Sequence, residues 1–284
     1  MLHMISLSYF GLSALGFGVA AYGTLIGAGG GFMLMPMLLL LYPHHNPSEL
    51  GAVSLGCILL NTASGAAAYA RMQQVDYKSA LLFSAATVPA SILGAMTTAY
   101  ISRQCFEAVF ALFILCLALF LIMYPKAVPR GMRKQNDADA GPAGPGIVPI
   151  SKSVNGIIFE YEYNLTTAMA IFFVLGFIVS FLGIGGGSLM VPALICLLNF
   201  PVFLAGGTTQ LIVALVCLAG IITHSGIGSI HAWGLNHIAA IGIGMLIGAQ
   251  MGAFLSVRIK GVWVLRSLAA ALAAAGIRMV FAAL

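Results

Sequence analysis

A glycine-rich segment suited to binding an anion occurs twice in this chain. Residues 27–36 read GAGGGFMLMP, and residues 183–192 read GIGGGSLMVP. Both copies lie between apolar runs, so each interrupts a helix and leaves backbone N–H groups free at a half-helix N-terminus, where anions bind well. Interrupted helices at matching positions of two halves indicate a transporter's binding site. Tight helix packing alone would also use glycines, but two copies in register favour a site.

Side chains on the helices that follow each copy would select the anion. Ser54 and Asn61 share one face of the helix after the first copy. For Asn61 and Gln210 a packing role remains open, because an amide in hydrocarbon needs partners wherever it lies. The predicted binding residues are Gly29, Gly30, Gly31, Ser54, Asn61, Gly185, Gly186, Gly187, Ser188, Thr208, Thr209 and Gln210.

The composition places the chain in a lipid bilayer. It has 284 residues, of which 61% are hydrophobic and 7% charged, whereas soluble domains carry about 25% charged residues. The net charge of +5 requires no nucleic-acid partner, because basic cytoplasmic loops are normal in membrane proteins. Apolar segments are expected near 5–26, 32–42, 49–70, 78–100, 105–124, 165–182, 188–200, 203–223, 235–257 and 262–284.

The two halves are predicted to be structural repeats. Small residues recur at every fourth position in each half, a pattern that allows membrane helices to approach closely. We therefore divide the chain into a first membrane repeat at 1–124, a cytoplasmic linker at 125–164 and a second membrane repeat at 165–284. The recurring small residues are Ala86, Ala90, Gly94 and Thr98 in the first repeat, and Ala240, Gly244, Gly248 and Gly252 in the second.

Positive charges favour an inverted arrangement of the repeats. If each glycine-interrupted pair begins and ends on one face, three further spanning helices per repeat invert the second repeat. With the N-terminus outside, the basic residues near Arg71, Lys78, the linker and Arg258 all fall inside, and only Arg103 falls outside. We thus expect an all-α, multi-pass protein of the inner membrane with both termini in the periplasm. Whether residues 5–42 form a re-entrant hairpin or two short crossings stays open.

Other chemistries have weaker sequence signals. Histidines at predicted loops, namely His44, His45, His224 and His231, leave a divalent transition-metal permease as the alternative function. No protease-type zinc motif or paired nucleophile and base is present in the sequence, so we expect neither an enzyme nor a bound cofactor or metal. The mid-membrane segments contain no acidic residue, so a proton or sodium relay through buried carboxylates is not visible in the sequence. Proton coupling by another route stays open.

The sequence resembles the sulfite exporter TauE/SafE permeases over essentially its whole length. The resemblance rests on the paired G-x-G-G-G motifs ending in Pro36 and Pro192, and on the hydroxyl-rich helix starts near Ser54 and Thr208. The glycines at 94 and 248 and the central linker complete the match. The resemblance implies a permease for small sulfur-containing anions, such as sulfite, thiosulfate or C2 sulfonates like sulfoacetate, usually moved outward.

Overall fold

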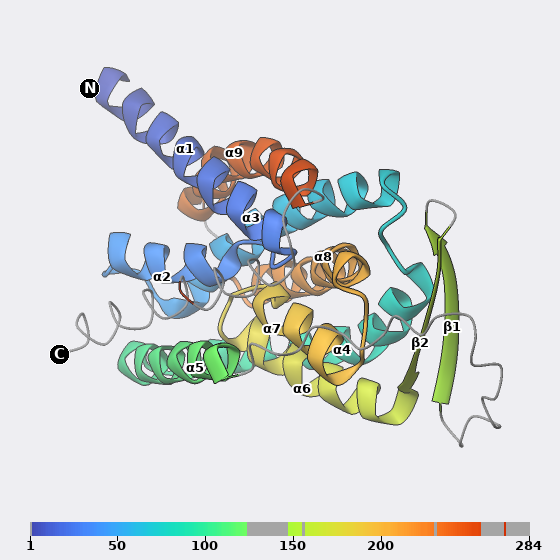
Figure 1. Ribbon diagram of the computed structural model, residues 1–284. Coiled ribbons are helices and arrows are strands. Elements are labelled where there is room, and N and C mark those ends of the chain that lie inside the picture. The colour runs from blue at the N-terminus through green and yellow to red at the C-terminus, as the bar shows by residue number, and fades with distance from the viewer. Residues whose placement is uncertain (1, 124–146, 155–156, 230–231, 257–269, 271–284) are drawn as a thin grey trace, which may run out of the picture.

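The protein is almost entirely helical, which confirms the expected all-α membrane fold (Figure 1). The computed structural model describes residues 2–123, 147–154, 157–229, 232–256 and 270. Its elements are α1 (Leu2–Ile26), α2 (Gly31–Leu41), α3 (Pro47–Arg71), α4 (Tyr77–Thr98), α5 (Arg103–Met123), β1 (Ile147–Val154), β2 (Ile157–Asn164), α6 (Leu165–Phe181), α7 (Gly187–Pro192), a π-helical turn η1 (Ala193–Leu197), α8 (Val202–Gly226) and α9 (Ala232–Ser256).

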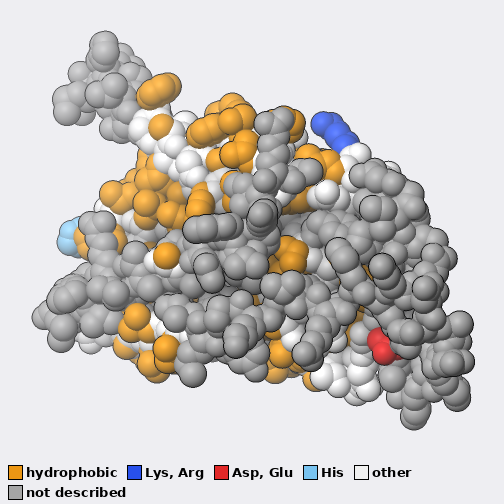
Figure 2. Space-filling view, viewed as in Figure 1, with side chains coloured by type: hydrophobic (Ala, Val, Ile, Leu, Met, Phe, Trp, Pro, Cys, Tyr) orange, Lys and Arg blue, Asp and Glu red, His pale blue; other side chains and the backbone are white. Residues whose placement is uncertain are grey.

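Five helices in the described part of the chain are long and apolar enough to cross a membrane: α1, α3, α4, α8 and α9. The most buried of the five are α3 and α8. Figure 2 shows hydrophobic side chains at the surface of the helical bundle. Ile222 of α8 and Ile247 of α9, for example, are 63% and 58% exposed. Such a surface fits lipid rather than water. The predicted segment near 262–284 lies outside the described residues except for residue 270.

The two repeats exchange their packing partners. The first helix of the first repeat, α1, packs against α9, and the first helix of the second repeat, α6, packs against α4. In the same way α3 packs against α9, while α8 packs against α4, and α3 and α8 contact each other. Each contact between repeats therefore has a counterpart with the roles reversed, as a pseudo-twofold relation requires.

The small residues of α4 and α9 lie against backbone, as predicted. A Cβ atom at Gly94 would collide with the carbonyl oxygen of Phe177, and one at Gly252 would collide with that of Ala21. Since Phe177 and Ala21 are 156 residues apart, the counterpart of Gly94 is Gly252. The sequence alignment of Gly94 with Gly248 is therefore displaced by about one helical turn.

An antiparallel hairpin, β1–β2, occupies the tail of the predicted linker (Figure 1). These strands were not predicted from the sequence. The charged first part of the linker lies outside the described residues. In β2, Tyr161 and Tyr163 are buried, while Glu162 between them is exposed. The two tyrosine rings pack on Phe200, and Tyr163 also packs on Phe83. The hairpin is thereby docked on one end of the helical bundle.

The helical bundle has two ends. The hairpin end carries β1–β2 and the connections at 72–76 and 198–201. The opposite end, called the cavity end, carries the connections at 42–46 and 227–229.

Candidate substrate site at the glycine loops

Both glycine motifs form the same backbone turn. In loop 1 (residues 27–30) the φ angles of Gly27, Gly29 and Gly30 are 80°, 73° and 74°. In loop 2 (residues 183–186) the three glycines at the same places have φ angles of 65°, 71° and 93°. Side chains rarely adopt this left-handed region, whereas glycine does so at no steric cost. The backbone thus explains three of the four glycines in each motif.

The fourth glycine is required because the two loops touch. A Cβ atom at Gly31 would collide with the carbonyl oxygen of Ile184 in loop 2. In the reciprocal contact, a Cβ atom at Gly187 would collide with the carbonyl oxygen of Ala28 in loop 1. The two interrupted helices therefore meet backbone to backbone, and they bring the two half-helix N-termini together.

Free backbone donors remain at both N-termini. Among the described residues, the N–H groups of residues 30–32 and 185–188 have no hydrogen-bond partner. The N–H group of Gly29 donates to the carbonyl oxygen of Gly23 at 3.1 Å, so in this conformation it extends the end of α1. Consecutive free N–H groups beside left-handed glycines form an anion-binding concavity. The helix dipoles of α2 and of the continuous α7–η1 segment add positive potential there.

The predicted site side chains of the first repeat, Ser54 and Asn61, are hydrogen-bonded within the protein. Asn61 donates from Nδ2 to the carbonyl oxygen of Gly29 at 2.7 Å, and its Oδ1 accepts from Thr24 Oγ1 at 2.9 Å. Ser54 Oγ donates to the carbonyl oxygen of Gly183 at 2.6 Å. These bonds tie loop 1 to α3 and loop 2 to the same helix. Both side chains therefore hold the loops in place.

The second repeat is different. Ser188 Oγ, Thr209 Oγ1 and both amide atoms of Gln210 are buried and have no partner in the described part of the chain. Gln210 Oε1 lies 3.1 Å from the position that a Cβ atom on Gly65 would take, and the Thr24 methyl group lies 3.2 Å from that position. The Gln210 amide is therefore close to Thr24, which precedes loop 1. Buried polar groups are almost always hydrogen-bonded, so such groups call for an explanation. Among the described residues, six have unpartnered buried polar side-chain atoms, and five of the six belong to the second repeat: Ser180, Ser188, Thr209, Gln210 and His224.

The remaining predicted residue, Thr208, is linked to the hairpin end. Its Oγ1 accepts from the N–H group of Asp76 at 3.0 Å. The carboxylate of Asp76 is buried and accepts from the Tyr161 hydroxyl at 2.7 Å, and burial together with this bond raises the pKa of Tyr161. Tyr163 makes a similar contact with Ser79 Oγ at 3.0 Å. The hairpin thus closes over the start of α8, next to Thr209 and Gln210.

Arg103, which begins α5 near the cavity end, caps a helix. Its Nη2 donates to the carbonyl oxygen of Leu39 at 3.0 Å, and its Nη1 donates to those of Tyr42 and His45. A guanidinium at the C-terminal end of α2 interacts favourably with the helix dipole. Its Nε also donates to Glu107 at 2.7 Å. Arg103 is therefore held at this face by its structural contacts.

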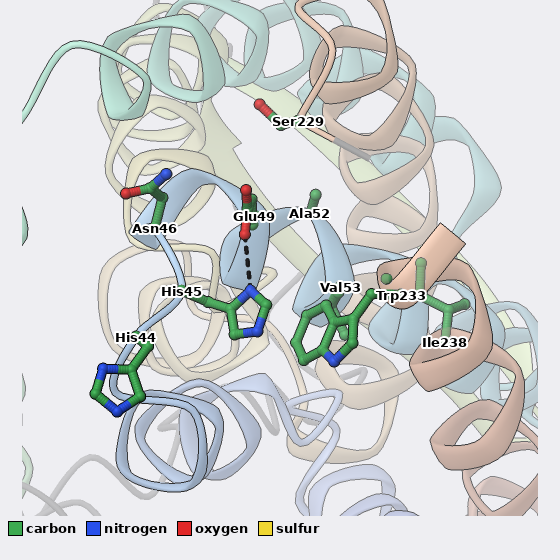
Figure 3. A pocket seen from close by; sticks show the side chains of 10 residues that line it. His44, His45, Asn46, Glu49, Ala52, Val53, Ser229, Trp233 and Ile238 are labelled. Carbon is green, nitrogen blue, oxygen red and sulfur yellow. Dashed lines mark hydrogen bonds and ion pairs between the residues drawn. The ribbon is translucent and has the colours of Figure 1, made fainter. Parts of the chain in front are cut away.

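A cavity of about 270 Å³ opens at the cavity end (Figure 3). His45 stacks on Trp233 with ring centroids 3.8 Å apart, and its Nδ1 contacts Glu49 Oε2 at 2.9 Å. His44 and Ser229 also line the cavity. Among the described residues no group of three or more His, Cys, Asp or Glu side chains could hold a metal ion, and His231 lies outside them. The metal-permease alternative is not favoured.

Comparisons with known proteins agree with these features. Residues 12–279 match the sulfite exporter TauE/SafE family. The chain belongs to that family. It is also similar to the probable membrane transporter protein YunE of Bacillus subtilis (strain 168), with 31% identity over 253 residues, which are 87% of this chain and 88% of the relative. No solved structure matches the chain significantly.

This TauE/SafE chain is thus a multi-pass membrane transporter, as the resemblance implied. Both descriptions are of transporters, in keeping with the expectation of a permease rather than an enzyme. The sequence analysis did not identify Ser180, Asp76 or Tyr161 as residues near the site, and it read His224 as a loop residue. Comparing the two repeats residue by residue would have drawn attention to Ser180 and His224, because their counterparts are Thr24 and Tyr69.

Proposed function

We propose that this TauE/SafE transporter exports small sulfur-containing anions, such as sulfite, thiosulfate or C2 sulfonates like sulfoacetate. The observation that carries the proposal is the set of unpartnered polar groups, Ser188, Thr209 and Gln210, beside two loops with free N–H groups. Hydroxyl, amide and backbone donors together match the several acceptor oxygens of a sulfite or sulfonate group.

The proposed site is neutral, and this suits transport. The described segments near the loops contain no lysine or arginine, so the anion would be held by hydrogen bonds and helix dipoles alone. A transport site must bind strongly enough for entry and weakly enough for release. Asn61 and Ser54 act in this account by fixing the loops, while Ser188, Thr209 and Gln210 contact the anion. Gly29 supports the turn, and Thr208 couples the site to Asp76.

We further propose that the repeats are inverted, with the hairpin end in the cytoplasm and both termini in the periplasm of the inner membrane. The reversed packing of α1 on α9 and of α6 on α4 supports this arrangement. With 11 residues, α2 is too short for a full crossing, which needs about 20. Its C-terminal end lies at the cavity end beside Arg103, whereas η1 leads back to Phe200 under the hairpin. Arg71 and Lys78 flank the hairpin end, as the positive-inside rule requires of a cytoplasmic face.

The test is uptake of labelled sulfite, and separately of a labelled C2 sulfonate, into proteoliposomes with and without a pH gradient. Saturable uptake by the wild type that Gln210→Leu lacks is the expected result, and Gly186→Val should behave likewise. The Gly18→Ala variant is the matched control, because no atom lies within 4 Å of the added Cβ. Absence of uptake of both anions by folded wild-type protein would contradict the proposal. The pH-gradient arm shows whether protons are coupled.

A further inference from the structure

Two further buried polar groups flank loop 2. Ser180, in the last turn of α6, and His224, in the last turn of α8, are 1% and 0% exposed. Ser180 Oγ and His224 Nε2 have no hydrogen-bond partner in the described part of the chain. Both differ in this respect from most buried polar groups, which find a partner in the fold.

Both groups border the same glycine-lined region. Ser180 Oγ lies 3.4 Å from the position that a Cβ atom on Gly220 would take. His224 is four residues after Gly220, so the two share one face of α8. His224 Nε2 in turn lies 3.9 Å from the position of a Cβ atom on Gly51, and Gly51 packs against Gly183 of loop 2. The two polar groups therefore adjoin loop 2 from α6 and α8.

The equivalent polar groups at loop 1 are hydrogen-bonded within the protein. There Tyr69 takes the place of His224, Thr24 that of Ser180, and Gly206 that of Gly51, each at an offset of 155 or 156 residues. The Tyr69 hydroxyl donates to the carbonyl oxygen of Thr24 at 2.8 Å, and Thr24 Oγ1 donates to Asn61. The imidazole of His224 is shorter than a phenol and makes no corresponding bond at Nε2.

The hydrogen bonds of His224 are compatible with a donor at its unpartnered nitrogen, Nε2. Nδ1 lies 3.3 Å from Ser48 Oγ, which is 2.8 Å from Ser229 Oγ. When Ser229 donates to Ser48 and Ser48 donates to Nδ1, the imidazole carries its proton on Nε2. In that tautomer two donors, Nε2–H and the Ser180 hydroxyl, have no acceptor among the described residues.

We propose that Ser180 and His224 form a second binding position for the transported anion, distinct from the position at Gln210. This inference rests on the proposed function and extends it. Ser229 lines the cavity, so the second position lies between that cavity and loop 2. Two weak positions in series allow an anion to enter and leave without a deep trap.

The test labels a cysteine at this position with two reagents of similar size. Ser180→Cys is introduced after the five native cysteines are replaced, and the protein is reconstituted. The anionic reagent is sulfonatoethyl methanethiosulfonate, which itself carries a C2 sulfonate, and the cationic one is its trimethylammonium analogue. After division by each reagent's rate with a free thiol, we expect the anionic reagent to react about tenfold faster.

A second substitution uses the first repeat as a guide. His224→Tyr installs in the second repeat the residue that the first repeat has at the equivalent position, Tyr69. The protein should therefore remain folded, while the labelling rate of the anionic reagent should fall about tenfold. The matched exchange Tyr69→His should leave labelling at position 180 unchanged. Equal rates for the two reagents, labelling by neither, or a rate unaffected by His224→Tyr would each overturn the inference.

The labelling experiment does not depend on transport. Selective labelling in a protein that takes up neither sulfite nor a C2 sulfonate would count against the proposed substrates and support the second position. Uptake that requires Gln210, together with unselective labelling at position 180, would support the proposed function and reject the second position.

Discussion

The two glycine loops follow the same backbone path, yet the polar side chains beside them are used differently. Near loop 1, Asn61, Thr24 and Tyr69 hydrogen-bond with one another, and Asn61 also donates to the carbonyl oxygen of Gly29 in the loop. Near loop 2, Ser180 and His224 leave polar atoms without partners, and Gln210 of the second repeat does the same beside loop 1. The two repeats thus share one scaffold, and among the described residues most of the unpartnered buried polar side chains belong to the second repeat.

The largest expected effect concerns what the two repeats share. Gly31→Ala and Gly187→Ala should both cost about 3 kcal/mol of folding free energy, because each Cβ meets a carbonyl oxygen of the other loop and the backbone cannot easily yield. Size-exclusion profiles and melting temperatures in detergent measure the loss. Gly18→Ala is the control and should melt like the wild type. A normally folded Gly187→Ala protein would refute the contact between the loops.

The next prediction separates the repeats. Asn61→Val and Gln210→Leu each install the residue found at the corresponding position of the other repeat, Val216 and Leu55. Asn61→Val should lower stability by about 2 kcal/mol, since Gly29 and Thr24 lose their partner. Gln210→Leu should leave stability unchanged or raise it. Thermal unfolding of the two variants side by side decides this, and equal destabilisation would remove the distinction between the repeats.

A smaller effect is expected at the C-terminal end of α2, where Arg103 caps the helix. The described residues of the second repeat have no such cap. Arg103→Gln should cost about 1 kcal/mol, because the carbonyl groups of Leu39 and His45 lose a cationic partner. Glu107→Gln keeps those carbonyl bonds and serves as the control. If both variants melt at the same temperature, the capping of α2 is not what Arg103 contributes.

An effect of similar size is expected at the hairpin. Tyr161→Phe leaves the buried carboxylate of Asp76 without one donor and should cost about 1 kcal/mol, more than Tyr163→Phe. Because the folded pKa of Tyr161 is raised, its contribution is fully present below the usual tyrosine pKa of about 10 and is lost as pH rises above it. Protease cleavage of the hairpin as a function of pH measures this. Wild type and Tyr161→Phe should converge at alkaline pH, and a constant difference would contradict the assignment.

Much of the scaffold could be predicted from the sequence because glycine and hydropathy patterns are local. The repeated G-x-G-G-G located both loops, and the apolar runs located α1, α2 and α3 to within a few residues. The hairpin was missed although Phe159, Tyr161 and Tyr163 alternate with glutamates, a period-2 signal for a strand. The Gly/Pro-rich residues before it drew attention to a linker instead.

The division of roles within the site could not be predicted in the same way. Whether Asn61 or Gln210 has a free amide depends on Thr24 and Gly29, which reach Asn61 only through tertiary packing. The sequence alone does not distinguish the amide that is hydrogen-bonded within the protein from the one that has no partner. Likewise, the role of Thr208 depends on the N–H group of Asp76, which lies 132 residues away in the chain.

The central claim is that the second repeat supplies the side chains that contact the anion, while the side chains of the first repeat supply the framework. Its most direct test is the initial rate of labelled sulfite uptake by Gln210→Leu and Asn61→Val proteoliposomes, normalised to folded protein. We predict that Gln210→Leu loses uptake at least about tenfold at unchanged stability, whereas the folded fraction of Asn61→Val retains most of its activity. Full activity of Gln210→Leu, with loss confined to Asn61→Val, would contradict the account.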